Sequence, residues 1–198
     1  MDQHASPTSA PTPLARTSLV ACLLAIGLIA VVTCPRSGRA QAASVPATLA
    51  GTWVLDGDPA RAARTIEAAF APSIATLPEL LQGFARDRIR SSMQPPRRVL
   101  VTIDGSRVRV TLESQRTTVV DGALGASARV TGVEDGTRVT PRLQGGWLEL
   151  LYEGEGSVLQ QLCSTEPDGA RMHLDFTVVS ARLPAPVRYR LDYVRPRS

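Results

Sequence analysis

The segment Gly51-Thr52-Trp53-Val54-Leu55-Asp56 carries the first strand pattern in this chain of 198 residues. Threonine, tryptophan, valine and leucine suit a half-buried pleated strand, and the turn residues Asp56-Gly57-Asp58-Pro59 end it. Asp58 is a favourable N-cap and Pro59 a favourable first helical residue, so a helix is expected to follow directly. The sequence therefore predicts a strand that leads into helices, and the rest of the chain is organised around it.

Two helices are expected between residues 59 and 92. Apolar residues recur at helical spacing over 59–71, and Pro72 is expected to end this first helix. The second helix is expected to begin at a capping box formed by Thr76 and Glu79. Its apolar stripe consists of Leu77, Leu80, Leu81 and Phe84.

From Arg98 onward the hydrophobic period changes from 3.6 residues to 2, which is typical of strands. Asp104-Gly105 is a tight hairpin signal, and further Gly-containing turns separate most of the later strands. The expected strands after the helices are 98–103, 107–113, 116–120, 127–132, 137–142, 147–153, 157–163, 172–179 and 187–194. The fold class is therefore mainly β. We expect an antiparallel up-and-down β-barrel of about ten strands, with a two-helix lid between the first and second strands, although a sandwich remains open.

Gly51 and Trp53 form a Gly-x-Trp pair, and the order of one strand, two helices and nine strands resembles the calycin superfamily. Within it, this order looks most like the fatty-acid-binding proteins, and the chain also resembles secreted bacterial lipocalin-like proteins. The resemblance implies a barrel whose helices cover a cavity for a fatty acid or retinoid. That family holds a carboxylate with an Arg-x-Tyr pair on its last strand. Here the last strand reads Arg188-Tyr189-Arg190-Leu191-Asp192-Tyr193, so inward tyrosines would turn the arginines outward.

The resemblance to lipocalin-like barrels also implies a closed end formed by Gly51, Trp53 and a late arginine. In such barrels the tryptophan lies beneath an arginine, and Arg190 or Arg195 can make that cation–π contact here. We assign the role to Arg190, together with Gly51 and Trp53. The inward faces of the late strands are then the expected cavity lining for a small apolar ligand, or else they simply fill the interior. The expected ligand-binding residues are Leu150, Tyr152, Val158, Gln160, Leu162, Leu174, Phe176, Tyr189, Leu191 and Tyr193.

The N-terminal residues 1–42 read as a secretory signal peptide, with an apolar run over 19–32 and an A-x-A site at Ala40-Gln41-Ala42. The lipocalin-like domain is then 43–198, exported to the periplasm or the cell exterior. Two alternatives remain, an uncleaved membrane anchor and a lipoprotein modified at Cys22 or Cys34.

The remaining charged and nucleophilic residues give no catalytic or metal site. Cys163 and His173 stand alone in the mature chain, and two ligands do not make a metal site. All basic residues are arginine and the formal net charge is only +4, so nucleic acid is not an expected partner. The densest basic cluster is a candidate contact for an anionic membrane surface or a solvated patch, and its members are Arg86, Arg88, Arg90, Arg97 and Arg98.

These observations favour a monomeric, secreted or periplasmic binding protein for a small hydrophobic ligand such as a fatty acid or an isoprenoid. No cofactor and no enzymatic activity are expected. The alternative is a packed barrel that acts as a protein- or envelope-interaction module without a ligand. An enzyme built on the same barrel is the least supported class, because no catalytic constellation is visible.

Overall fold

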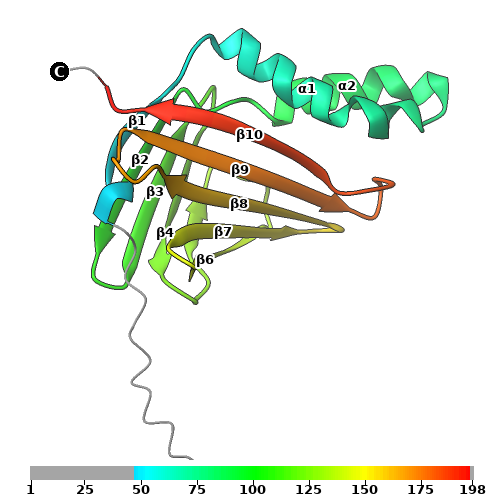
Figure 1. Cartoon of the computed structure of the whole chain (residues 1–198). Helices are drawn as coiled ribbons and strands as arrows, with labels where there is room; N and C mark the ends of the chain where they lie inside the picture. The colour runs from blue at the N-terminus through cyan, green and yellow to red at the C-terminus, as the bar shows by residue number, and fades with distance from the viewer. Residues whose placement is uncertain (1–46, 197–198) are drawn as a thin grey trace, which may run out of the picture. The chain divides into compact units, whose positions relative to one another are not determined.

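The structure is a computed structural model and describes residues 47–196. The predicted signal segment 1–42, with Cys22 and Cys34, lies outside the described residues. A short 3-10 helix, two α-helices and ten strands follow each other along the chain (Figure 1). Their bounds are η1 Ala47–Leu49, β1 Gly51–Leu55, α1 Pro59–Ala75, α2 Glu79–Ser92, β2 Arg98–Asp104, β3 Arg107–Glu113, β4 Thr117–Ala123, β5 Arg129–Thr131, β6 Arg138–Gln144, β7 Trp147–Gly154, β8 Ser157–Thr165, β9 Arg171–Ser180 and β10 Val187–Val194.

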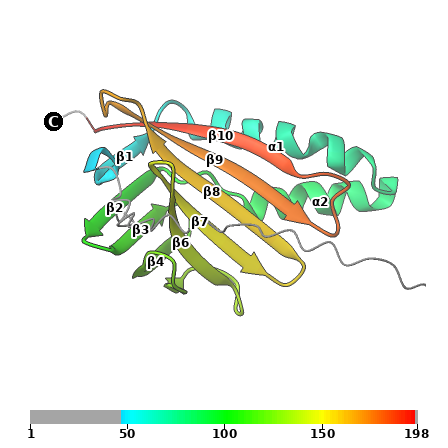
Figure 2. The ribbon, with the colours of Figure 1, turned by 60° about the horizontal axis from the view of Figure 1, so that its bottom comes forward.

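All ten strands belong to one antiparallel sheet with the order β5-β4-β3-β2-β1-β10-β9-β8-β7-β6. The two edge strands approach each other through the segment after β4, where the amides of Gly125 and Ala128 donate to the carbonyls of Pro141 and Val139 at 2.7 and 2.8 Å. The sheet therefore curves into a nearly closed barrel, as Figure 2 shows. The predicted barrel of ten strands is confirmed, and the sandwich alternative is wrong.

Both helices follow β1, as predicted, but the first one is longer than expected. Helix α1 continues through Pro72 to Ala75. Its buried residues Ile66, Phe70 and Ile74 recur every four positions, so the apolar face continues beyond the proline. Pro72 itself is exposed, where water can solvate the carbonyl that its missing N–H leaves without a partner.

The predicted start of the second helix is wrong. Thr76 ends α1 instead, and its hydroxyl donates to the carbonyl of Ser73 at 2.8 Å. Helix α2 begins at Glu79 after Pro78, without a side-chain cap. Proline favours the extended conformation in the residue before it, so Leu77 breaks the helix and the capping box cannot form.

The expected apolar stripe of α2 does not pack against the barrel. Leu80 is 82% exposed, Phe84 is 73% exposed and Leu81 is 48% exposed. The side of α2 that contacts the core carries Ala85, Ile89 and Met93, all only partly buried. Figures 1 and 2 show the two helices side by side, with α1 next to β10. Each fully buried apolar side chain of α1 stabilises the fold by about 1.5–3 kcal/mol, so α1 is held firmly and α2 weakly.

Candidate functional site

The interior of the barrel is closed at one end by Trp53. Its side chain is fully buried, and its indole N–H donates to the carbonyl of Leu49 at 3.0 Å. The guanidinium carbon of Arg195 lies 4.3 Å from the ring centroid, which is a cation–π contact. Arg195 also donates to the carbonyls of Thr48, Ala50 and Gly169. Its side chain therefore connects η1, the residue before β1 and the turn before β9 next to Trp53.

Gly51 explains why the Gly-x-Trp pair is needed here. It has a positive φ of 125°, and a Cβ atom at this position would lie 2.5 Å from Nη1 of Arg195. A larger residue would therefore displace the guanidinium from Trp53. The predicted closing roles of Gly51 and Trp53 agree with this geometry.

Of the two arginines considered from the sequence, Arg195 closes the barrel, and the assignment of this role to Arg190 is wrong. Arg190 lies on the outer face of β10, where it donates to both carboxylate oxygens of Asp175 at 2.6 and 2.9 Å. The hydrogen bond to Asp175 raises the pKa of Arg190 further above its ordinary value. Tyr189 and Leu191 face inward on the same strand, so the alternation forces Arg188 and Arg190 outward, as the sequence predicted.

Three of the predicted lining residues face the wrong way. Strand β8 pairs with β7 so that Gln161 lies opposite Leu150 and Cys163 lies opposite Leu148. The inward residues of β8 are therefore Leu159, Gln161 and Cys163. Val158, Gln160 and Leu162 point outward, and the Gln160 amide donates to the Glu149 carboxylate there.

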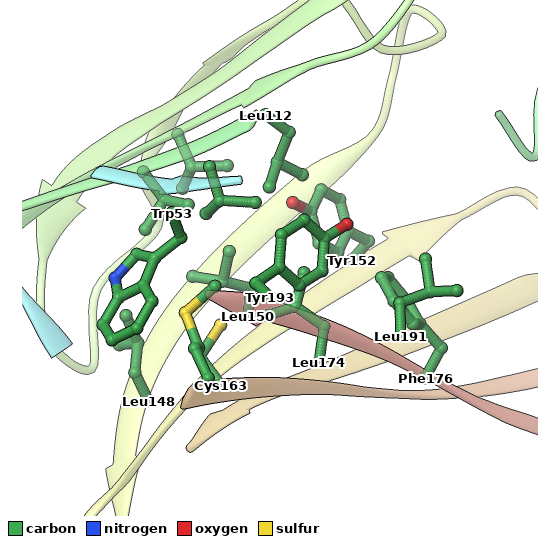
Figure 3. Packing of buried hydrophobic residues seen from close by; sticks show 14 of the residues in the cluster. Trp53, Leu112, Leu148, Leu150, Tyr152, Cys163, Leu174, Phe176, Leu191 and Tyr193 are labelled. Atoms are coloured by element: carbon green, nitrogen blue, oxygen red, sulfur yellow. The ribbon is translucent and has the colours of Figure 1, made fainter. Parts of the chain in front are cut away.

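The other predicted lining residues share the interior of the barrel: Leu150, Tyr152, Leu174, Phe176, Tyr189, Leu191 and Tyr193. Figure 3 shows Trp53, Leu148 and Cys163 at one end of this cluster, with Phe176 and Leu191 farther along. The side chains around Trp53 have no exposed surface, so this end is tightly packed. Farther from Trp53, Leu112, Tyr152 and Phe176 keep 9%, 7% and 6% of their surface exposed, and the inward residues Val178 and Tyr189 are half-buried.

Helix α1 covers this looser end through one aromatic contact. The ring of Phe70 lies 6.4 Å from the ring of Tyr189, which stacks on Phe176 at 4.7 Å. Tyr189 is only half-buried. The three rings form an aromatic boundary between the helix and the interior.

One polar group within the interior, the Gln161 amide, was missed because hydrophobic periodicity does not detect it. Burial raises the pKa of the Cys163 thiol to about 12, so the thiol stays protonated and inert. Its neighbour Gln161 is 1% exposed and donates to the Cys163 sulfur at 3.7 Å.

His173 lies on the outer face and cannot act as a base for this thiol. Its Nδ1 is 2.7 Å from Asp192, and its Nε2 is 3.5 Å from Glu166. Across residues 47–196, no three His, Cys, Asp or Glu side chains are grouped to hold a metal ion.

The predicted basic cluster lies on α2 and at the start of β2. A surface cleft of about 330 Å³ separates α1 from α2, and Arg86 and Arg90 line it beside apolar residues such as Ile89. Arg90 is paired with Glu67, and this hydrogen bond lowers the pKa of Glu67. Arg97 and Arg98 are exposed on the other side of Met93 in the chain, and Arg98 pairs with Glu113 at 3.5 Å. Within the described part of the chain, neither helix is long and apolar enough to span a membrane.

No protein-family profile matches this sequence, and no curated protein sequence matches it. Among solved structures, a point mutant of the fluorescent protein UnaG is similar, with 13% identity, a TM-score of 0.50 and coverage of 76% of this chain and 98% of that chain. The REP1-NXSQ fatty acid transporter has 17% identity, a TM-score of 0.47 and coverage of 76% and 97%. Fatty-acid-binding protein 1 of Echinococcus granulosus has 13% identity, a TM-score of 0.44 and coverage of 76% and 98%. At 13% identity the likeness to the UnaG mutant shows the fold alone.

Proposed function

We propose that this protein is an exported carrier that binds one small hydrophobic ligand inside the barrel, at the end covered by α1. The observation that carries this proposal is the uneven packing of an apolar interior. The end around Trp53 is fully packed, whereas Leu112, Tyr152 and Phe176 at the other end keep some exposed surface. Half-buried inward side chains such as Val178 and Tyr189 leave apolar surface at this end that a ligand can cover.

Of the two helices, α2 can move aside at small cost, whereas α1 is held by its buried residues. Helix α2 has no buried residue, and its ion pairs with the rest of the protein, Arg90 with Glu67 and Arg88 with Glu134, are exposed. Such pairs stabilise by at most about 1 kcal/mol each. A ligand then needs to replace the contact of Phe70 with Tyr189 and enter between them.

The lining favours an aliphatic chain, such as that of a fatty acid or an isoprenoid derivative. The inward residues near this end include Leu112, Leu159 and Val178, and its aromatic residues are Tyr152, Phe176 and Tyr189. Burial of about 25 cal/mol per Å² of apolar surface drives binding of such chains without a dedicated polar site.

A fluorescence titration with Nile red tests this function with a matched pair of variants. Val178 points inward and is half-buried, whereas Val179 is its outward neighbour and is 46% exposed. We expect Val178→Trp to fill the site and weaken binding at least about tenfold, the effect of losing roughly 1.4 kcal/mol. Val179→Trp serves as the control and should bind like the parent protein. Equal binding by both variants would place the dye outside the barrel and contradict the proposal.

Export is part of this proposal and has its own test. N-terminal sequencing of the protein isolated from its native cell envelope should begin at Ala43, after the A-x-A site. A lipid-modified cysteine at residue 22 or 34 would instead support the lipoprotein alternative, and a retained residue 1 would support the anchor.

Contact with the envelope surface is the second candidate function, and the exposed face of α2 favours it. Leu80 and Phe84 project into solvent at 82% and 73% exposure, and Arg86 and Arg88 follow them on the same helix. Apolar side chains beside arginines are the composition that binds at anionic lipid surfaces.

Flotation with phosphatidylglycerol vesicles tests this contact. The Leu80→Gln/Phe84→Gln double variant and the Arg86→Glu variant should each remove the protein from the vesicle fraction. Trp147→Gln is the control, because Trp147 is also an exposed apolar residue, 51% exposed, but belongs to β7 and not to α2. Vesicle binding that survives both changes on α2 would rule out this second function.

A further inference from the structure

The Tyr152 side chain points into the barrel and ends in a polar atom without a partner. Tyr152 is 7% exposed, and its hydroxyl oxygen is the one fully buried side-chain nitrogen or oxygen in residues 47–196 that has no hydrogen bond. A phenol hydroxyl can donate one hydrogen bond and accept others. Buried polar groups without partners are rare because they lose their hydration and gain nothing in return.

Tyr193, the other deeply buried tyrosine, has a structural hydrogen bond that Tyr152 lacks. The Tyr193 hydroxyl donates to the carbonyl of Pro96 at 2.9 Å, which fixes the start of β2 against β10. Figure 3 shows both side chains in the same cluster, close to Leu112. Tyr152 makes no such bond, so its hydroxyl does not serve the packing of the barrel.

The surroundings of Tyr152 contain no charge. Its cross-strand neighbours are Val139 on β6 and Leu159 on β8. In the ten strands that the structure describes, the inward positions carry no arginine, aspartate or glutamate, because Arg188 and Arg190 both point outward. An ionised carboxylate placed here would be buried with one hydrogen bond and no counter-charge, which is strongly unfavourable.

For a neutral head group, the cost of burial is smaller than for a carboxylate, and one hydrogen bond can offset much of it. A carbonyl or alcohol oxygen carries no net charge, so one hydrogen bond offsets a large part of the hydration that it loses on burial. The Tyr152 hydroxyl can supply that bond, and the loosely packed end of the barrel lies next to it.

We propose that the Tyr152 hydroxyl is the polar contact for the head of the bound ligand, and that this head is a neutral hydroxyl or carbonyl group on an apolar chain. This inference rests on the proposed carrier function and deepens it. It excludes the ionised fatty acid as the preferred ligand and selects long-chain alcohols, aldehydes, ketones or esters.

Displacement of Nile red by four ligands of equal chain length, at pH 8, tests the inference. The ligands are hexadecanol, methyl palmitate, hexadecane and palmitate. We expect the parent protein to bind the alcohol and the ester more tightly than the alkane, and to bind ionised palmitate weakest. In Tyr152→Phe, binding of the alcohol and ester should fall roughly fivefold to tenfold, as for one lost hydrogen bond, while hexadecane binding stays unchanged.

Two further measurements separate ligand recognition from structure. Tyr193→Phe removes a hydroxyl that has a partner, the Pro96 carbonyl, and should lower thermal stability. Tyr152→Phe without ligand should be at least as stable as the parent protein, because the change removes a buried group that lacks a partner. A clear loss of stability would mean that the hydroxyl has a structural partner, and it would overturn the inference.

The remaining outcomes distinguish this inference from the proposed function. If the parent protein binds palmitate more tightly than hexadecanol, or if Tyr152→Phe affects all four ligands equally or not at all, the head-group contact is wrong and the carrier function stands. If neither Nile red nor any of the four ligands binds the parent protein, the carrier function fails and the inference fails with it.

Discussion

The closure of the barrel by Arg195 gives the sharpest prediction about stability. Replacing Arg195 with alanine removes the cation–π contact with Trp53 and the hydrogen bonds to three carbonyl groups. Trp53 keeps its hydrogen bond to the Leu49 carbonyl and its place in the hydrophobic core, so the variant should fold. The change therefore isolates the contribution of one side chain that joins η1, β1 and the turn before β9.

The magnitude follows from these contacts. An exposed cation–π contact contributes about 0.5–1 kcal/mol, and each net hydrogen bond about 0.5–1.5 kcal/mol. Arg195 is exposed, and water can replace part of its bonding in the alanine variant, so the lower values apply. We expect a loss of about 2 kcal/mol, which corresponds to a fall in Tm of about 4–8 °C for a domain of this size.

Urea unfolding of matched variants measures this loss. Arg190→Ala is the control, because its pair with Asp175 is exposed and should contribute at most about 1 kcal/mol. Gly51→Ala should cost at least as much as Arg195→Ala, since its Cβ would displace the same guanidinium. If Arg195→Ala unfolds at the same urea concentration as Arg190→Ala, the assignment of Arg195 to barrel closure is refuted.

Three more predictions follow from buried and exposed positions. Burial raises the pKa of Cys163 from 9.0 to about 12, so the folded protein favours the neutral thiol and loses stability as the pH rises above 9. We expect the free energy of unfolding to fall by about 2 kcal/mol by pH 10.5. Urea unfolding should show a shallower loss with pH in Cys163→Ala. Gly83→Ala should raise the free energy of unfolding by about 0.5–1 kcal/mol, because nothing lies within 4 Å of the added Cβ; an unchanged Tm would argue against a formed α2. Leu174→Ala should cost about 2–5 kcal/mol, because Leu174 has no exposed surface, and a loss below 1 kcal/mol would contradict tight packing near Trp53.

The strands could be predicted in order because most of them have one solvent-exposed face. On β3, Val108 and Val110 are buried, while Arg107 and Arg109 are exposed, so alternation alone identifies the strand and its inner face. The same rule failed on β8. There Val158, Leu159 and Leu162 put apolar residues on both faces, and only the pairing with β7 reveals which face is inside.

The helices show a second limit of periodicity. Pro72 is a strong local signal, but the packing of Phe70 and Ile74 against the barrel outweighs it. On α2 the apolar residues Leu80 and Phe84 repeat at helical spacing, yet they face solvent. Periodicity identifies a face, but it does not say whether the partner of that face lies in the same chain.

The candidate site was only partly visible in the sequence. The aromatic residues of β10 were identified, because Tyr189 and Tyr193 alternate with charged residues. The lack of a hydrogen bond at Tyr152 and the placement of Arg195 over Trp53 depend on contacts between distant strands. No spacing along a single strand encodes such contacts.

Native mass spectrometry of the protein isolated from its own cell envelope tests the central claim most directly. The account predicts a single chain that carries one small apolar molecule, and denaturing extraction should release a compound with a neutral oxygen-bearing head. A protein that is empty in this measurement, and that does not bind Nile red after purification, would contradict the carrier function.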